Sequence, residues 1–268
     1  MKPDWKAEAV KQWDADPCGA DRNSGFATPE FFERVERDRY VNYAPWMKTA
    51  IGFDRHSGDR VLEVGFGLGT DYVSFARAGA RCFGIDLTPA HVDATRRRLR
   101  GIGYPVRLTR GDAETLPFRD ESFDVVYSFG VLHHTPGTQA AIGEIHRVLR
   151  PGGEVIVGLY HRDSAIFWGY YVLVWGILRG GFLRDGYRST LSRIERREHS
   201  DAIPLVQVYS RRKARRLFSG FSEVRIKTHH FSFDQAKGPG RFAKRFFAKL
   251  EPALEKSFGW YLIVRGHK

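Results

Sequence analysis

The chain has 268 residues, 42% of them hydrophobic and 14% aromatic, which excludes a disordered tail, a collagen and a disulfide-stapled miniprotein. Cys18 and Cys82 form neither a disulfide framework nor a zinc motif, so we expect a protein of the reducing cytoplasm. The net charge of +12 lies within residues 179–249, where 18 basic residues accompany 6 acidic ones. This local excess favours contact with phosphate, anionic lipid or an acidic ligand over a role in general solubility. A solvated arginine-rich surface is the alternative, because it would have the same composition.

The N-terminal segment predicts helices that lie outside the main domain. Its first ten residues are charged where a secretory signal would be apolar, and no apolar run of membrane-spanning length follows in the chain. Thr28 and Pro29 are typical of a helix start. The apolar residues of this helix recur at helical spacing: Phe31, Phe32, Val35 and Tyr40. We expect the helix to end near Pro45 and to form a lid.

From residue 60 onward, buried strands alternate with helices, which predicts a parallel α/β sheet. The expected strands are Arg60–Val64, Arg81–Asp86, Val106–Arg110, Phe123–Ser128 and Glu154–Leu159. The expected helices are 70–78, 89–100 with Thr88 as a side-chain cap, and 138–149, which ends at Pro151-Gly152-Gly153. Two later strands, Glu223–Thr228 and Trp260–Val264, would complete seven.

These elements predict an α/β fold with a doubly wound, seven-stranded, mostly parallel sheet. The expected organisation is an N-terminal helical lid (1–53), a Rossmann-like core (54–160), a helical cap inserted after the fifth strand (161–210) and a C-terminal helix with the last two strands (211–268).

A glycine-rich turn follows the first strand, in the sequence Glu63-Val-Gly65-Phe-Gly67-Leu-Gly69. Glycines there let the chain turn sharply and let a ligand approach the backbone. Asp86 ends the second strand 23 positions after Glu63, where a carboxylate can accept hydrogen bonds from ribose hydroxyls. This order of elements predicts a nucleotide-like ligand; a tight turn without a ligand is the alternative.

The spacing of the glycines favours one cofactor class. The dinucleotide fingerprint is G-x-G-x-x-G, whereas this turn reads G-x-G-x-G after an acid. Glu63 would repel a pyrophosphate but could lie near a cationic amino acid group, which suits S-adenosylmethionine (SAM) better than NAD.

Residues 61–159 resemble the class I SAM-dependent methyltransferases, in the broad small-molecule group. The similarity lies in five motifs: Val61–Thr70, Gly84–Pro89, Gly111–Phe118, Ser122–Ser128 and Arg147–Gly153. The resemblance implies SAM as cofactor and S-adenosylhomocysteine as product, and it says little about the acceptor.

The resemblance also implies roles for individual residues. Glu63, Gly65, Gly67 and Gly69 would lie beside the methionine and ribose of SAM, and Asp86 with Leu87 would hold the ribose. Asp112 and the Ala113 backbone would bind adenine. Ser128, Phe129 and Gly130 would line the floor beneath the reactive methyl group, although a small residue such as Ser128 at a strand end is also common structurally.

Four residues are candidates for catalysis. His133 and His134 follow the fourth strand and Tyr160 ends the fifth, all at the edge where open α/β sheets bind ligands. Tyr40, with Tyr43, could close over the site from the lid helix. A structural role is an alternative for each of them.

Several substrate classes and groups are disfavoured. The chain has Ser128-Phe-Gly-Val131 where amino methyltransferases of nucleic-acid bases carry an Asn/Asp-Pro-Pro-aromatic motif. Asp163 alone does not supply the clustered acids of a catechol-type metal site, so we expect no metal.

The insertion is the most unusual part of the chain. Residues 166–178 carry no charge, and six arginines follow by residue 197. We favour a buried cap helix over an apolar acceptor pocket. Peripheral contact of residues 166–216 with an anionic membrane, at its inner face, and a homodimer interface are the alternatives.

The sequence therefore predicts a SAM-dependent methyltransferase that acts on a small, apolar or lipid-like acceptor. A methyltransferase of RNA or another polyanion is the alternative enzyme, and we expect nucleic acid to be an unlikely partner. A non-catalytic SAM-binding regulatory subunit is the alternative from another class.

Overall fold

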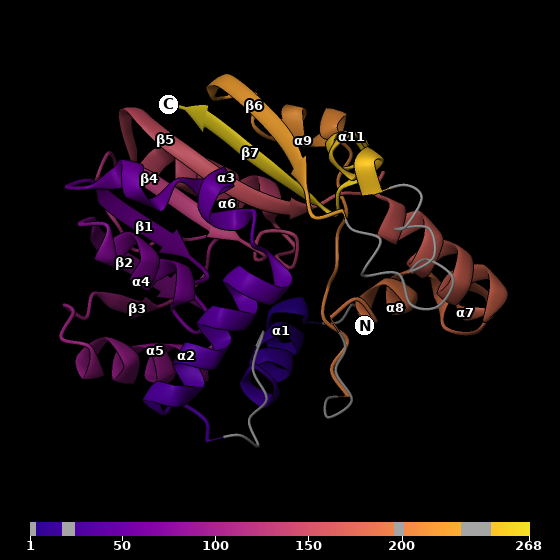
Figure 1. Cartoon of the computed structure of the whole chain (residues 1–268), viewed down its shortest axis with the longest axis horizontal. Helices are drawn as coiled ribbons and strands as arrows, with labels where there is room; N and C mark the ends of the chain where they lie inside the picture. The colour runs from indigo at the N-terminus through magenta and orange to yellow at the C-terminus, as the bar shows by residue number, and fades with distance from the viewer. Residues whose placement is uncertain (1–3, 18–24, 196–200, 232–247) are drawn as a thin grey trace.

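A seven-stranded open sheet forms the centre of the computed structural model, which describes residues 4–17, 25–195, 201–231 and 248–268 (Figure 1). The strand order is β3-β2-β1-β4-β5-β7-β6. The strands are β1 (Arg60–Val64), β2 (Arg81–Asp86), β3 (Leu108–Arg110), β4 (Phe123–Phe129), β5 (Leu149–Tyr160), β6 (Ser222–His229) and β7 (Tyr261–His267). β1 to β5 pair in parallel, and β7 runs antiparallel to β5 and β6. The predicted doubly wound, mostly parallel sheet is confirmed.

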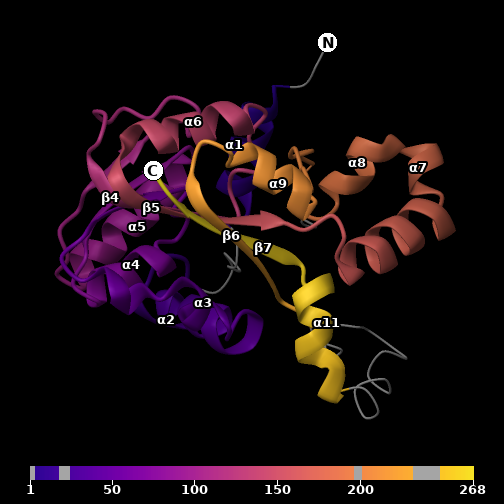
Figure 2. The same cartoon turned by 90° about the horizontal axis from the view of Figure 1, so that it is seen from above.

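Helices cover both faces of the sheet (Figure 2). Neighbouring residues of a strand point to opposite faces, so each is buried by the helices on its own side. Val61 packs in the apolar cluster that holds Phe75 of α4 (Thr70–Arg77), and α3 (Met47–Ile51) covers the same face. Leu62 packs in the cluster that holds Ile145 of α6 (Thr138–Val148) and Phe218, which follows α9 (Arg211–Leu217). The remaining crossover helix is α5 (Pro89–Gly101).

The N-terminal segment forms more helices than the sequence predicts. α2 (Pro29–Arg37) begins as expected, with the Thr28 hydroxyl accepting a hydrogen bond from the Phe31 N–H at 3.3 Å, and it continues as the π-helix η1 (Asp38–Tyr43). α1 (Trp5–Ala15) was not predicted; Asp4 caps it, and it packs against α5. A short turn, η2 (Phe53–His56), leads into β1.

The ends of several elements differ from the sequence-based expectations. β5 starts at Leu149, directly after α6, because Leu149 pairs with Phe123 before the register shifts at Val125. The edge strand β3 starts at Leu108. Thr88 occupies the cap position of α5, but its side chain makes no capping hydrogen bond.

The chain after β5 forms a helical arm that lies beyond the end of this strand in both views (Figures 1 and 2). The arm contains the π-helix η3 (Phe167–Leu178), α7 (Gly181–Arg184) and α8 (Gly186–Ser192). The sequence favours a buried cap helix, yet only Phe167 and Gly176 of η3 are buried. The η5 turn (Ala248–Leu250) and α11 (Glu251–Phe258) precede β7. Within the described ranges, no helix has the length and apolar character required to cross a membrane.

Candidate functional site

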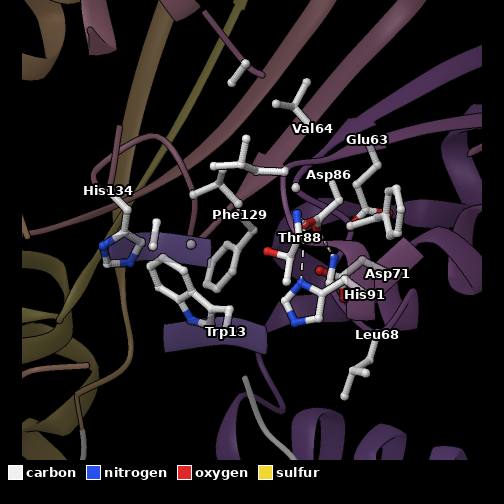
Figure 3. Close-up of a pocket in the computed structure, with 18 of the residues that line it drawn as sticks. Trp13, Glu63, Val64, Leu68, Asp71, Asp86, Thr88, His91, Phe129 and His134 are labelled. Carbon is white, nitrogen blue, oxygen red and sulfur yellow. Dashed lines mark hydrogen bonds and ion pairs between the residues drawn. The ribbon is translucent and has the colours of Figure 1, made fainter. Parts of the chain in front are cut away.

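A cavity of about 460 Å³ lies at the carboxyl edge of the parallel strands, where open α/β sheets bind their ligands (Figure 3). Glu63, Asp86 and His91 lie at one end of it, and Trp13 and His134 lie at the other. The predicted nucleotide end and the predicted acceptor end therefore share one continuous cavity.

The glycine turn after β1 contains two kinds of glycine. All three glycines have positive φ, 78° at Gly65, 52° at Gly67 and 68° at Gly69. A Cβ on Gly65 would lie 2.1 Å from Val131, and one on Gly69 would lie 2.5 Å from Thr95. A Cβ on Gly67 would meet no atom within 4 Å and would occupy open space beside the cavity. Gly65 and Gly67 line the cavity, and Gly69 serves the packing of the turn on α5.

Asp86 is buried at the end of β2, and backbone hydrogen bonds hold it in place. Its carboxylate accepts from the N–H groups of Gly67 at 2.8 Å and Thr88 at 2.9 Å, and it pairs with His91 at 3.3 Å. Burial alone would raise the pKa of Asp86, but His91 and the two N–H donors hold it below its usual value. The cavity therefore presents an ionised carboxylate, which is the acceptor that ribose hydroxyls require.

Glu63 presents an unpartnered carboxylate oxygen to the cavity. The side chain is buried in β1, and its Oε2 atom has no hydrogen-bond partner among the described residues. Burial, followed by the charge of the neighbouring Asp71, raises the pKa of Glu63 well above its usual value. A cationic ligand group would suit this site, because it would donate a hydrogen bond to the unpartnered oxygen and its charge would stabilise the ionised carboxylate.

Asp71, in the first turn of α4, connects the lid helix to the cavity. It accepts two hydrogen bonds from Arg39, one of them at 2.8 Å from Nε, and further ones from Tyr40 at 2.6 Å and Tyr127 at 2.8 Å. Tyr40, a predicted catalytic residue, is buried and absent from the cavity lining among the described residues. The structure thus places Tyr40 where it positions Asp71 and Arg39, and Arg39 itself reaches the cavity.

Asp112 and Ala113, the predicted adenine residues, line the cavity together with Leu87. Asp112 forms an ion pair with Lys6 of α1, and Lys6 also contacts Glu114 at 2.9 Å. The unpredicted helix α1 therefore closes the cavity at the residues predicted to bind adenine.

Ser128 does not reach the cavity. It is fully buried, and its hydroxyl donates to the Val64 carbonyl at 2.9 Å. Phe129 and Gly130, the other two residues of the predicted floor, line the cavity together with Val131. The chain turns at Gly130, whose φ is 79°.

The far end of the cavity is lined mainly by aromatic side chains. They come from elements far apart in the sequence: Trp13, Tyr43, Phe129, Tyr160, Tyr171, Trp260 and Tyr261. Tyr160 stacks on Trp260 with ring centroids 4.5 Å apart, and the hydroxyl groups of Tyr43 and Tyr261 are 2.6 Å apart. This lining suits an apolar ligand with few polar groups.

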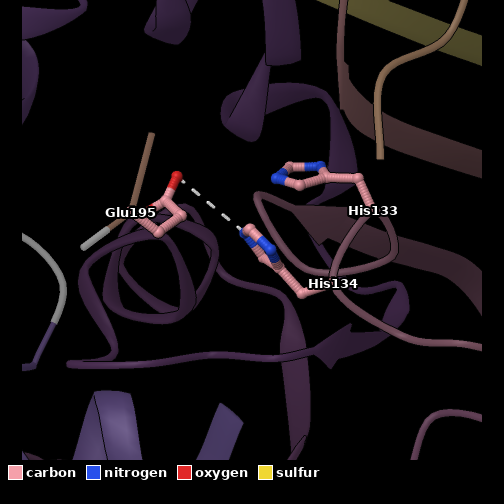
Figure 4. A group of neighbouring side chains, drawn as sticks. All are labelled: His133, His134 and Glu195. Carbon is pink, nitrogen blue, oxygen red and sulfur yellow. Dashed lines mark ion pairs between the residues drawn. The ribbon is translucent and has the colours of Figure 1, made fainter. Parts of the chain in front are cut away.

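His134 and Glu195 supply the polar groups at this end (Figure 4). The Nδ1–H group of His134 donates to the Leu205 carbonyl at 2.7 Å, so the neutral ring carries its lone pair on Nε2. This Nε2 atom lies 4.0 Å from Oε1 of Glu195, which also accepts the Tyr160 hydroxyl. Burial lowers the pKa of His134, while Glu195 and the Leu205 carbonyl oppose the shift. His134 can therefore accept a proton at Nε2, next to a carboxylate.

His133 lies behind this group and outside the cavity lining of the described residues. It is fully buried, and its ring lies 3.8 Å from that of Tyr160 between centroids. Neither ring nitrogen has a hydrogen-bond partner among the described residues, and burial holds the pKa of His133 well below its usual value. The structure thus gives the two adjacent histidines different surroundings.

His133, His134 and Glu195 place one ligand atom each within 4.8 Å of one another, and all three are residue types that bind zinc (Figure 4). Existing hydrogen bonds compete with this use, because Glu195 accepts the Tyr160 hydroxyl and His134 retains only Nε2. We interpret the group as one that handles protons, and the expectation that the chain uses no metal stays a prediction.

Sequence reasoning missed Glu195, Trp13, Arg39 and Lys6 at this cavity. Glu195 lies 61 positions beyond His134, and no local motif connects the two residues. Trp13 contacts the His134 ring, with centroids 4.7 Å apart, from a helix that the sequence did not predict. The one available signal for Glu195 was that it is an acidic residue within the predicted insertion, 161–210, which follows the paired histidines in the chain.

Residues 62–157 match the family described as "Methyltransferase domain". A phthiotriol/phenolphthiotriol dimycocerosates methyltransferase of Mycobacterium leprae is 43% identical over 101 residues, which cover 37% of each chain. A demethylmenaquinone methyltransferase of Tropheryma whipplei is 37% identical over 122 residues, which cover 44% of this chain and 49% of the relative. The chain thus matches less than half of the length of these relatives.

Solved structures share the fold over most of the chain at low identity. A SAM-dependent methyltransferase of Thermotoga maritima, titled a possible histamine N-methyltransferase, has a TM-score of 0.57 at 19% identity and covers 89% of this chain and 96% of its own. The [4+2]-cyclase SpnF has a TM-score of 0.61 at 18% identity and covers 99% of this chain and 96% of its own. Since a cyclase shares the fold, the fold alone does not determine the chemistry.

Proposed function

We propose that this chain transfers the methyl group of SAM to a small, apolar or lipid-like acceptor, and the match of residues 62–157 to the methyltransferase domain family supports this proposal. The observation that carries this proposal is one continuous cavity with a carboxylate-rich end beside the glycine turn and an aromatic end beside His134.

The cofactor end has the groups that SAM requires. The unpartnered Oε2 of Glu63 would accept the ammonium group, and the ionised Asp86 would accept the ribose hydroxyls. Gly67 leaves open space at the backbone, while Asp112 and Ala113 would hold the adenine. The charge at Glu63, the hydrogen-bond acceptor at Asp86 and the free space at Gly67 thus each match a different part of SAM.

Bound SAM supplies an electrophilic methyl group on a sulfonium, and its transfer leaves S-adenosylhomocysteine. The tasks left to the chain are orientation, exclusion of water and removal of a proton if the acceptor is protonated. His134 would take that proton at Nε2, because its Nδ1–H group is held by the Leu205 carbonyl. Glu195 would stabilise the resulting imidazolium, and Tyr160 would orient Glu195.

The acceptor class follows from the aromatic end of the cavity. An apolar molecule would bury its surface against rings such as Tyr160, Tyr171 and Trp260, and a single hydroxyl or acidic C–H group would face His134. The relatives named for phthiotriol dimycocerosates and for demethylmenaquinone are consistent with an acceptor of this class.

The test is incubation with methyl-labelled SAM and a cell extract, followed by separation of lipid, aqueous small-molecule and nucleic-acid fractions. We expect label in the lipid fraction, and label mainly in RNA would overturn the acceptor class. A His134→Gln variant should bind SAM normally and lose label in the product, and His146→Gln on α6 serves as the matched control. No label in any fraction despite measured SAM binding would refute methyl transfer to a cellular acceptor.

A further inference from the structure

The helical arm, residues 164–194, exposes large apolar side chains to an unusual degree. Trp168 is 54% exposed, Ile177 60%, Leu178 71%, Leu183 95% and Tyr187 53%. They lie on η3, α7 and α8, which form the end of the molecule beyond β5 (Figures 1 and 2). An exposed apolar set of this size on a protein surface indicates a contact with another apolar body.

Positive charge accompanies these apolar groups. The arm contains four arginines, of which Arg179, Arg184 and Arg188 are exposed, and one aspartate before Glu195. Asp185 is paired with Arg193 at 2.8 Å and with the exposed Arg184 at 3.4 Å. The Arg179 guanidinium lies 4.3 Å from the Trp175 ring centroid. Tryptophan, tyrosine, leucine and arginine together are typical of a segment that lies in a lipid headgroup region.

The same arm also lines the cavity. Tyr171 and Ile194 belong to the cavity lining, and the Tyr171 ring lies 5.9 Å from that of Trp260 between centroids. The first part of η3 is anchored in the core through Phe167, which is 2% exposed. One end of the arm thus contacts the acceptor end of the cavity, and the other end is exposed.

We propose that the arm binds the interfacial layer of an anionic membrane and delivers an apolar acceptor from that layer to the cavity. Delivery of the acceptor rests on the proposed function, whereas membrane binding is measured independently of it. The twelve residues of η3 fall short of the ~20 needed to span a bilayer, which is consistent with a segment lying in the interface. Anionic headgroups would meet the exposed arginines while the leucines and aromatic rings enter the acyl boundary.

Charge distinguishes this partner from a second copy of the chain. Two arms packed face to face would bring Arg179, Arg184 and Arg188 of each copy near one another, whereas a headgroup layer neutralises them. Self-association is therefore the competing outcome of the test.

The experiment is flotation of the full chain with phosphatidylcholine vesicles that contain or lack phosphatidylglycerol. We expect binding that requires the anionic lipid and weakens with salt. Leu183→Ser should weaken it about tenfold, because this side chain would be transferred from water into the acyl boundary. Arg188→Gln should weaken it about fivefold. The matched controls, Ile102→Ser and Arg100→Gln on and just after α5, should bind like the parent chain.

Two further measurements separate the arm from the active site. Each arm variant should bind SAM like the parent chain and should methylate a detergent-dispersed lipid extract at the parental rate. Vesicle binding without any methyl transfer would leave the arm assignment intact and refute the proposed function. Equal flotation of Leu183→Ser and the parent chain, or a concentration-dependent dimer that Leu183→Ser dissociates while neither floats, would overturn the membrane assignment.

Discussion

Replacement of Glu63 by glutamine should weaken SAM binding while preserving the fold. The glutamine side chain has nearly the same shape as that of glutamate, but it cannot offer a charged oxygen to the ammonium group of SAM. A hydrogen bond to a charged group contributes about 1.5–3 kcal/mol, which corresponds to a roughly 10- to 150-fold higher Kd. The Oε2 atom of Glu63 has no partner among the described residues, so none of them supplies a hydrogen bond that replaces the lost one.

The pH dependence of binding tests the same carboxylate independently. Burial and Asp71 raise the pKa of Glu63 in the free protein, whereas a bound ammonium group would favour the ionised form. SAM binding should therefore release a proton at pH values between the pKa of Glu63 in the complex and its raised pKa in the free protein, and the affinity should increase as the pH rises through that range. The Glu63→Gln variant should lack this slope.

Stability should change in the opposite direction. Since the folded pKa of Glu63 lies above the unfolded one, the folded state binds more protons, and stability decreases as the pH rises between the two values. Without SAM, Glu63→Gln should therefore have a higher Tm than the parent chain at alkaline pH.

Calorimetry in buffers of different ionisation enthalpy measures both the Kd and the proton release. Glu33→Gln, on the exposed side of α2, is the matched control and should behave like the parent chain. If Glu63→Gln binds SAM with the parental Kd and the parental proton release, the assignment of this carboxylate to the ammonium group is refuted.

Three further predictions concern the rest of the cavity. Asp86→Asn should raise the Kd for SAM about 10- to 100-fold and lower the Tm, because backbone N–H groups lose a charged acceptor; an unchanged Kd in calorimetry would contradict the ribose role. His134→Gln should lower kcat about 10²- to 10⁴-fold without changing the Kd for SAM, and a parental kcat would exclude His134 as the base. Gly65→Ala should reduce the Tm, since its Cβ would collide with Val131, whereas Gly67→Ala should fold and bind SAM poorly; equal effects in thermal melts and calorimetry would refute the distinction between the two glycines.

The parallel sheet could be predicted because its signals are local. β1 and β2 are short apolar runs bounded by turn residues, and the order of strand, glycine turn, helix and acid is read directly from the chain. Asp86 consequently lies where its position in the sequence places it.

Other parts of the cavity depend on contacts between distant segments, and these contacts could not be predicted. α1 is placed by Lys6 reaching Asp112, a contact across 106 positions that no local pattern indicates. His133 and His134 look equivalent in the sequence, and contacts with distant residues distinguish them, such as the packing of Tyr160 on His133 and the carbonyl of Leu205 at His134. Tyr40 has the spacing of a core residue, but its hydroxyl group also donates a hydrogen bond to Asp71. The sequence does not indicate that Asp71 lies beside it.

Only some of the residues that line the cavity lie within the segment that is similar to known methyltransferases. The matched residues, 62–157, contain Glu63, the glycine turn and Asp86, so similarity there concerns the cofactor end and His134. Tyr160, Tyr171, Glu195 and Trp260 lie beyond residue 157, and Trp13 lies before residue 62. Those residues line the end of the cavity where we propose that the acceptor binds, so two chains could share the matched segment and methylate different molecules. On this proposal, substitutions in the aromatic lining should change acceptor preference while leaving SAM affinity unchanged.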